Sequence, residues 1–487
     1  MAAGALAPAS SLRFPQRTIA SGNEGWRIAE GTGMERRAPQ GDVWRRPVAA
    51  QAAYPSAAMP SFQWHATPST LPSRNAVSSS TSHRVTAGMS NGFADDVSAR
   101  LHRLLFTDAK ALRVHVGDCF DQATMGDKHL DLAGLVLFIS YLSRRLGVPP
   151  DAFGDVHDQF LRFDFDGNGS LEPHETYKLV KAQLVNYWRR TLGHRVDVPI
   201  PTKTLEEAGY VPVKQLGMGS QGTVMLVKDK MNDDYCIKSV SKNSQNSDVL
   251  SDIQEEFMKM KYLQNANIAS THEIFQDASF YYVVNDPYFG GDLTQLKSRA
   301  RQAGVSMTKD WWRRMFRQCI SALAWMHEQA VMHCDIKEQN IMLKTEDCKE
   351  PKVVLIDLGL ARAATVGGGG VAGTPGYIPP ETWQTGKWFP RGDIFSMGVV
   401  MMQLLTDRRI FTEGCTTKEE VAQATLTRHP PYKSMPQDYD NVSALLMKML
   451  EKELLKRLKA PQVLEEDFFE DGVGGMARFL GSFCIVR

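Results

Sequence analysis

Oxygen-bearing residues are closely spaced between residues 164 and 175, in a pattern that suits a hard cation. The segment reads DFDGNGSLEPHE, with a glycine at the sixth position for a sharp turn and a glutamate at the twelfth. Calcium takes about six to eight oxygen ligands, and a glutamate at the twelfth position can bind it through both carboxylate oxygens. The predicted ligands are Asp164, Asp166, Asn168, Ser170 through its carbonyl, Glu172 and Glu175. Because every fixed position of the EF-hand pattern is filled, we expect a calcium site rather than an acidic turn that binds nothing.

A second, degenerate loop is expected upstream, because EF-hand loops usually occur in pairs. Residues 123–134 read ATMGDKHLDLAG, which places Leu130 where the first loop has Leu171. Residues of this segment at the liganding positions include alanine, methionine and glycine, which offer no carboxylate. We therefore expect residues 123–134 to complete the fold without binding metal.

A glycine-rich segment between two short β-like runs has the spacing of a phosphate-covering loop. Residues 217–224 read GMGSQGTV, and a lysine follows in the run CIKSV at Lys238. The predicted nucleotide contacts here are Leu216, Gly217, Met218, Gly219, Ser220, Gln221, Gly222, Thr223 and Val224. A buried lysine in a strand needs an acidic partner. We expect Glu256 to be that partner, with Glu255 as the alternative.

Three further motifs follow in a fixed order and carry the strongest chemical signal. Residues 333–340 read HCDIKEQN, residues 357–359 read DLG, and residues 379–381 read PPE. Together with the glycine loop, this set resembles the protein kinase superfamily from about Tyr210 to Phe469.

The resemblance implies a role for each matching residue. Asp335 would accept the proton of a substrate hydroxyl, and Lys337 would neutralise the γ-phosphate of ATP. Asn340 and Asp357 would hold Mg²⁺, while Lys238 would hold the α- and β-phosphates. Nucleotide contacts are also implied for Asp286 and Tyr288 in the hinge and for Asp292 near the ribose. Lys337 and Thr374 are typical of Ser/Thr kinases, Glu381 should pair with Arg457, and Asp393 should anchor the catalytic loop.

The sequence departs from the family pattern at several positions. Cys334 replaces the arginine that normally binds an activation-loop phosphate, so phosphorylation of Thr365 or Thr374 should matter less. Residues 367–370 are four glycines without an evident phosphate clamp. Asn285 is polar beside the hinge, which the pattern does not explain. Gln339 stands where kinases that prefer basic substrates often have glutamate.

The join of EF-hands to a kinase resembles the calcium-dependent protein kinases of plants and alveolates. Most of those carry the EF-hands after the kinase, whereas here they precede it. The resemblance implies a calcium-regulated Ser/Thr protein kinase, in which the helical module or the linker within residues 187–209 docks on the kinase. Two alternatives remain open: a calcium-sensing pseudokinase scaffold, and an active kinase with a structural EF-hand module.

The elements that must position these residues follow from apolar spacing. Helix-face spacing joins Leu101, Leu104 and Leu105, then Leu112, Val114 and Val116, then Leu132, Leu135, Val136, Phe138 and Ile139. After Tyr210 short β-rich runs precede long helices, which predicts an α+β, bilobal kinase fold behind an all-α EF-hand pair. The expected divisions are a disordered tail (1–95), an EF-hand module (96–190), a linker (191–209), the kinase domain (210–470) and a C-terminal tail (471–487).

Composition limits which binding partners and which cellular compartment we expect for this chain. The net charge is +1, so we expect no nucleic-acid partner, and the 7 cysteines are scattered, as in a reducing compartment. The longest apolar run, residues 132–142, is shorter than the roughly 20 residues of a membrane span. We expect a cytoplasmic monomer that binds ATP, Mg²⁺, Ca²⁺ and protein substrates. The opening residues, with Arg and Ser but no acid, also suit an organelle transit peptide.

Overall fold

The computed structural model describes residues 91–190, 200–219, 222–242, 263–358, 362–363 and 371–470, with helical positions at 254, 257 and 261. All of them fall within one compact unit, Val85–Arg487. The predicted C-terminal tail, residues 1–90 of the predicted N-terminal tail, the four-glycine segment, Thr365, Ser220, Gln221, Glu255 and Glu256 lie outside the described residues. The N-terminal tail was expected to extend to residue 95, but the chain is already helical from Asn91.

The first described part is all helical. Its elements are α1 (Asn91–His102), a π-helical turn (Arg103–Thr107), α2 (Ala109–Thr124), α3 (Leu132–Leu146), a 3₁₀ turn (Pro150–Phe153), α4 (Val156–Phe163) and α5 (Pro173–Arg190). Asp108, Asp131 and Asp155 cap α2, α3 and α4 by accepting backbone N–H bonds at 2.9, 2.7 and 2.8 Å. Each cap satisfies a donor that the helix leaves unpaired, which fixes where these helices begin. We call α1–α5 the helical module.

The core of the helical module follows the apolar stripes only in part. Phe138 and Leu135 on α3 are fully buried, as are Phe153 and Phe163. The expected core positions Val114 and Val136 are each 52% exposed, and Leu132 is 38% exposed. The prediction was wrong at these three positions. Leu132 and Val136 belong to an apolar run longer than one helix stripe, which must turn part of itself outward, and Val114 lies two residues from the buried Leu112 and Val116, a spacing that puts it on another face of α2.

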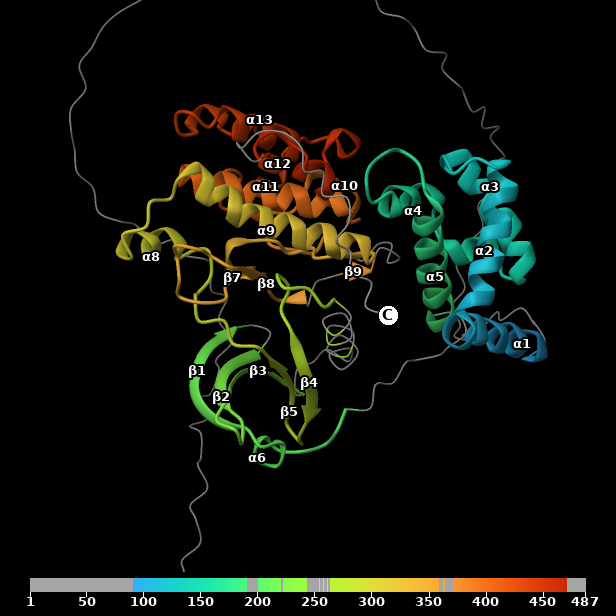
Figure 1. Ribbon diagram of the computed structural model, residues 1–487, viewed down its shortest axis with the longest axis horizontal. Coiled ribbons are helices and arrows are strands. Elements are labelled where there is room, and N and C mark those ends of the chain that lie inside the picture. The colour runs from blue at the N-terminus through green and yellow to red at the C-terminus, as the bar shows by residue number, and fades with distance from the viewer. Residues whose placement is uncertain are drawn as a thin grey trace, which may run out of the picture. The chain divides into compact units, whose positions relative to one another are not determined.

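A five-stranded antiparallel sheet forms the next part (Figure 1). The strands are β1 (Val211–Gly219), β2 (Gly222–Lys228), β3 (Asp234–Ser241), β4 (Thr271–Gln276) and β5 (Phe280–Asn285), in the order β1-β2-β3-β5-β4. The short helix α6 (Leu205–Ala208) begins with a capping box between Thr204 and Glu207. Residues 201–203 bond to Gln276 at the end of β4. The second half of the predicted linker therefore belongs to the edge of this sheet.

The last described part is mainly helical. Its helices are α8 (Leu296–Gln302), α9 (Lys309–Glu328), α10 (Pro380–Thr385), α11 (Pro390–Thr406), α12 (Lys418–Thr427), α13 (Asp440–Met449) and α14 (Ala460–Leu464). Short 3₁₀ turns cover Glu338–Asn340, Tyr432–Ser434 and Leu454–Lys456. Two small two-stranded antiparallel sheets lie in this part: β6 (Val331–Met332) pairs with β9 (Arg362–Ala363), and β7 (Ile341–Leu343) pairs with β8 (Val353–Leu355). We call it the helical lobe.

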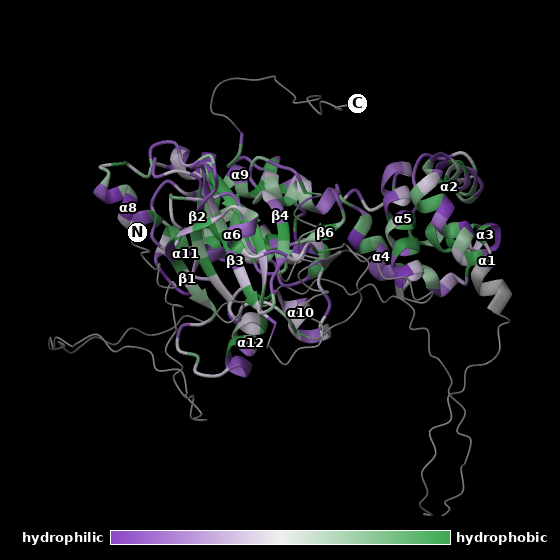
Figure 2. Cartoon of the chain, turned by 90° about the horizontal axis from the view of Figure 1, so that it is seen from below, coloured by the Kyte–Doolittle hydropathy of each residue, from purple (hydrophilic) through white to green (hydrophobic). Residues whose placement is uncertain are grey.

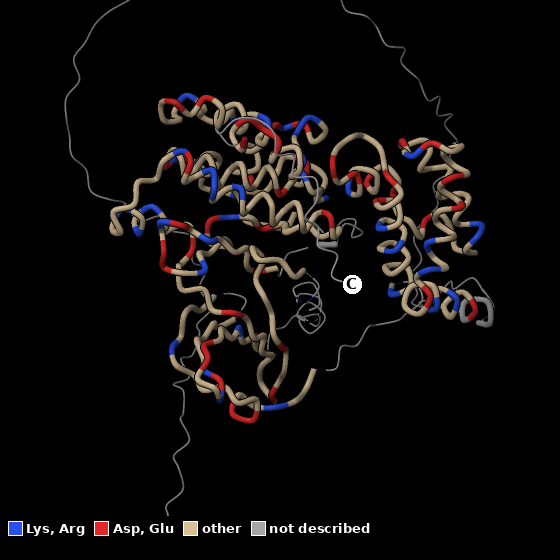
Figure 3. Tube along the Cα trace, in the orientation of Figure 1, with Lys and Arg blue, Asp and Glu red and all other residues tan. Residues whose placement is uncertain are grey.

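The central helix of this lobe is α11, which is buried along most of its length. Its side chains and those of α9 join the largest apolar cluster of the described residues, and Figure 2 shows the hydrophobic colour along both helices. Acidic and basic residues are intermixed over most of the described residues (Figure 3), although α8 carries Lys297, Arg299 and Arg301 without an acidic residue. A sheet lobe followed by a helical lobe agrees with the predicted α+β class.

Among the described helices, none alone has the length and apolar composition of a membrane span. The bent pair Leu132–Leu146 and Pro150–Phe163 passes that test when it is taken together.

Candidate active site and cation loop

The carboxylate of Asp335 is the centre of a dense hydrogen-bond network between β6 and β7. Its Oδ1 accepts bonds from the Thr374 backbone N–H (3.0 Å) and hydroxyl (2.6 Å). Its Oδ2 accepts bonds from Lys337 Nζ (2.7 Å) and Asn340 Nδ2 (3.0 Å). Asp335 is 7% exposed. The structure thus brings the predicted base, lysine and amide together, and it adds Thr374 from a segment almost forty residues later.

The backbone that presents Asp335 is held from the core by Asp393 on α11. One oxygen of Asp393 accepts the His333 N–H (2.8 Å), and the other accepts the Cys334 N–H (2.9 Å). Asp393 is fully buried, and His327 contacts it at 2.8 Å. Cys334 has a φ of 65°, an unfavourable backbone conformation for a residue with a side chain. The predicted anchoring role of Asp393 is confirmed.

Asp357 and Lys238 lie at the opposite side of this site. Their side chains form an ion pair, with 3.6 Å between Lys238 Nζ and Asp357 Oδ1. Asp357 also has a left-handed φ of 62°, while the next residue, Leu358, is fully buried in the core of the helical lobe. The side-chain NH₂ group of Asn340 donates to Asp335. The amide oxygen of Asn340 is therefore the atom that can bind a cation. A carboxylate and an amide oxygen fit Mg²⁺, which is bound with few protein ligands.

The glycine loop is the hairpin between β1 and β2. Gly219 pairs with Gly222, and Met218 pairs with Thr223. Gly222 has a φ of 134°, and a Cβ there would lie 2.1 Å from the Ser239 carbonyl oxygen. Glycine is therefore required at position 222 by both conformation and space.

The hinge side chains serve mainly to join β4 to the chain that follows β5. Asp286 contacts His272 at 2.6 Å, and the Tyr288 hydroxyl accepts the Ser270 N–H at 3.2 Å. Asn285, the polar residue that the sequence left unexplained, accepts a bond from the Thr271 hydroxyl at 2.7 Å. Asp292 accepts the N–H of Thr294 at 2.9 Å, and its backbone bridges to β7 at Met342.

A buried ion pair supports the far side of the helical lobe. Both terminal nitrogens of Arg457 donate to the two carboxylate oxygens of Glu381, at 2.7 and 2.8 Å. Arg457 is 1% exposed and Glu381 is 7% exposed. This bidentate pair confirms the predicted partnership.

Residues 210–469 match the family described as protein kinase domain. The chain belongs to the protein kinase family. It is 32% identical over 270 residues to calcium-dependent protein kinase 4 of Plasmodium berghei (strain Anka), covering 53% of this chain and 49% of that protein. The corresponding kinase of Plasmodium falciparum (isolate 3D7) is 31% identical over 272 residues, with 54% and 49% covered. Serine/threonine-protein kinase Nek1 of Mus musculus is 28% identical over 279 residues, with 53% and 23% covered. The chain thus spans about half the length, or less, of these curated relatives.

Outside the matched kinase domain, residues 164–175 gather the carboxylates of Asp164, Asp166 and Glu175, with oxygens within 4.8 Å of one another. Asp164 accepts the Gly167 N–H at 2.8 Å, and Asn168 accepts the Ser170 N–H at 2.8 Å. We call this segment the cation loop. Its donor set is made of hard oxygens, which fits Ca²⁺.

Glu175 is buried at the end of this loop, where it is 1% exposed. Burial raises the pKa of its carboxyl to about 7, although the N–H groups of Glu172 and Phe165 bond to it. Glu172, the expected ninth-position ligand, contacts His174 at 3.2 Å.

The degenerate loop pairs with the cation loop through one short bridge. The Leu130 N–H bonds to the Leu171 carbonyl (2.9 Å), and the Leu171 N–H bonds back (2.7 Å). Both leucines are buried. The eighth positions of the two segments are therefore opposite each other, in the register expected from the sequence.

The helical module contacts the kinase, as expected, and the described contacts lie at the cation loop and its flanking helices, which the motifs did not specify. Lys459, just before α14, lies 2.9 Å from Asp164 Oδ2, and Gln462 donates to the Gly167 carbonyl at 3.3 Å. Lys459 is 2% exposed, and burial lowers the pKa of its ammonium group to about 8. A lysine is rarely buried without a partner, but nothing in its local sequence marks which one it meets.

Helices α4 and α5 add further contacts to the kinase. Arg162 of α4 donates its Nε–H to the Trp388 carbonyl (3.3 Å), and its guanidinium lies over the Phe389 ring at 5.2 Å. Lys178 of α5 donates to the Glu328 carbonyl at 2.7 Å. Arg162 is fully buried, so this contact excludes water.

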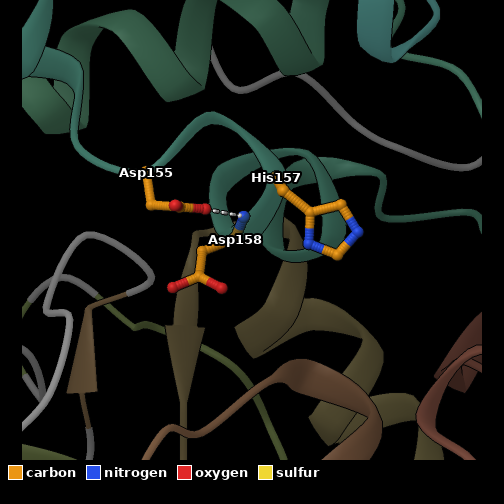
Figure 4. Close-up of side chains that lie close together, drawn as sticks. All are labelled: Asp155, His157 and Asp158. Atoms are coloured by element: carbon orange, nitrogen blue, oxygen red, sulfur yellow. Dashed lines mark hydrogen bonds between the residues drawn. The ribbon is translucent and has the colours of Figure 1, made fainter. Parts of the chain in front are cut away.

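A second group of possible ligands, Asp155, His157 and Asp158, lies at the start of α4 (Figure 4). Asp155 is directed at the Asp158 backbone nitrogen, which it caps at 2.8 Å. The Asp158 carboxylate pairs with Lys387 of the kinase at 2.7 Å. The two carboxylates of this group therefore serve a helix cap and an ion pair.

Proposed function

We propose that this chain is a Ser/Thr protein kinase that transfers the γ-phosphate of ATP to protein hydroxyls and is regulated by calcium at the cation loop. The observation that carries the catalytic part is the position of Asp335 between Lys337, Asn340 and Thr374, with bonds of 2.6 to 3.0 Å. Such a network fixes a carboxylate where a hydroxyl proton must be taken.

Each of these residues has its own role in the proposed phosphoryl transfer. Asp335 orients the substrate hydroxyl and takes its proton as the new oxygen–phosphorus bond forms and the bond to the β-phosphate oxygen breaks, releasing ADP. Lys337, bonded to Asp335 and Thr374, places positive charge beside the transferred group. Lys238 binds the phosphates that remain on the nucleotide. Asn340 and Asp357 would hold Mg²⁺, which would neutralise charge on the phosphates.

Transfer of labelled phosphate from Mg-ATP to a generic protein substrate tests the catalytic proposal. Asp335→Asn should abolish transfer, since an amide cannot take the proton. Asp310→Asn is the matched control, because the Asp310 side chain is 54% exposed on the surface of α9, where it pairs with the neighbouring Arg313 and Arg314. Absence of transfer in the unmodified chain would instead support a pseudokinase.

Calcium regulation is supported by the oxygen donor set of the cation loop and by its contacts with the kinase. Two relatives whose names include "calcium-dependent" add weight to this part of the proposal. Sensor loops bind calcium at about 10⁻⁷–10⁻⁵ M, a range suited to signalling. Glu175→Gln should remove calcium binding measured by calorimetry and remove any calcium effect on transfer. A calcium effect that persists in this variant would place regulation elsewhere.

A further inference from the structure

A positively charged side chain of the kinase domain lies against the cation loop. Lys459 Nζ lies 2.9 Å from Asp164 Oδ2, on the first ligand of the loop. At 2% exposure the ammonium group is shielded from water. A neighbouring contact supports this position: Gln462 on α14 donates to the carbonyl of Gly167 inside the same loop at 3.3 Å.

The charged groups around the Lys459 ammonium group come from the cation loop and from the kinase domain. From the loop, Asp164 and Glu175 attract it. From the kinase, Arg391 of α11 repels it and is itself attracted by Asp164. Lys459 is therefore a counter-ion to the loop carboxylates, placed where a bound divalent cation would add charge of the same sign.

We propose that Lys459 is an internal counter-ion that holds the calcium-free loop on the kinase and that Ca²⁺ must displace it in order to bind. Calcium would bind an oxygen of the same carboxylate at about 2.3–2.6 Å, a shorter distance than that between Lys459 Nζ and Asp164 Oδ2. Two positive charges on one carboxylate in a water-excluded site repel strongly, so only one of them can stay. The inference rests on the proposed calcium function and adds the residue that opposes it.

Displacement would also undo the contact around Lys459. Once the ammonium group leaves Asp164, the neighbouring bond from Gln462 to Gly167 loses its support, and Lys459 must move to water or find another acid. Calcium binding would then loosen the cation loop from α14 and from Lys459, which precedes it.

Calorimetric titration of the full chain with CaCl₂ tests this inference. Lys459→Met keeps the length of the side chain and removes the charge, so calcium should bind at least tenfold more tightly than in the unmodified chain. Lys456→Met is the matched control, since Lys456 lies three residues earlier and is 65% exposed, and it should leave the Kd unchanged. Equal Kd values for Lys459→Met and the unmodified chain would overturn the inference while leaving the calcium site intact. No binding in any chain would overturn both.

A measurement on the unmodified chain guards against a variant that fails to fold. An amine-acylating reagent should modify Lys459 slowly without calcium and at least several-fold faster with it, while Lys456 reacts equally in both states. If Lys459 stays protected at saturating calcium, the ammonium group has not been displaced and the inference is wrong.

Discussion

The indole of Trp388 packs against Cys334, the residue immediately before Asp335. Both side chains are buried in one small apolar cluster with Met332. The Trp388 indole N–H donates to the Ala372 carbonyl at 3.2 Å, and its own carbonyl accepts the bond from Arg162. Kinases with an arginine at position 334 use it to bind a phosphate. Here an apolar contact fills that place and connects the helical module to the backbone of the catalytic loop.

Activity should depend little on phosphorylation of the activation segment. Cys334 cannot bind a phosphate, so Thr365→Ala should change kcat less than about twofold. Thr374→Ala is the contrasting variant, because its hydroxyl bonds to both Asp335 and Lys337, and its loss should lower kcat by about 10²-fold. Phosphatase treatment followed by a kinase assay checks the first point. A large loss in Thr365→Ala would show that another residue binds phosphate.

Removing one member of the Glu381–Arg457 pair should destabilise the kinase strongly. Glu381→Gln leaves the buried guanidinium without its carboxylate, which should cost about 3–5 kcal/mol of unfolding free energy. The double variant Glu381→Leu with Arg457→Met removes both charges and should cost less than the single change. Urea unfolding of the three chains measures this difference, and equal losses would mean that the pair is not coupled.

Gly222→Ala should weaken the sheet lobe, because the added Cβ would lie 2.1 Å from the Ser239 carbonyl oxygen at a φ of 134°. We expect a loss of about 1–3 kcal/mol and weaker binding of an ATP analogue. Gly217→Ala is the matched control for stability, since nothing lies within 4 Å of its added Cβ. Equal thermal stability of the two variants would contradict the prediction.

Stability should rise with pH in the alkaline range, in part because of Lys452. Burial lowers the pKa of this lysine from 10.5 to about 8, beside the Phe411 ring at 4.1 Å. The unfolded chain therefore binds more protons than the folded chain between about pH 8 and 10.5, so the penalty for burying the charge fades across that window. Lys452→Met should be more stable at pH 7 and should show a smaller gain in Tm from pH 7.5 to 9.5. Lys433→Met, on the exposed surface, should match the unmodified chain.

Sequence reasoning predicted the cluster around Asp335 because its members lie close together in the chain. Asp335, Lys337 and Asn340 lie within six positions, so one short motif specifies their spacing, and the local backbone conformation brings their side chains together. The cation loop is readable for the same reason. The resemblance to kinases also predicted the distant pair of Glu381 and Arg457, which spacing alone could not have done.

The contacts between separate parts of the chain could not be predicted in this way. A lysine such as Lys459 is normally solvated, and its burial depends on a surface that exists only after folding. The same holds for Arg162 and for the Thr271–Asn285 bond across β4 and β5, where side-chain type leaves the partner open. Apolar periodicity likewise identified α3 as a helix but placed Val136 on the wrong face.

The attachment of residues 201–203 to the end of β4 has a consequence for how the helical module would respond to calcium. This segment is tied to the sheet by backbone bonds with Gln276 and by the Lys203–Glu273 ion pair at 2.8 Å. Residues 191–200 separate it from α5, which at full extension span at most about 35 Å. A module released from the kinase on so short a tether would stay at an effective concentration of about millimolar. Its return would be a unimolecular event, so the response to calcium should be rapid, reversible and independent of how much of the protein is present.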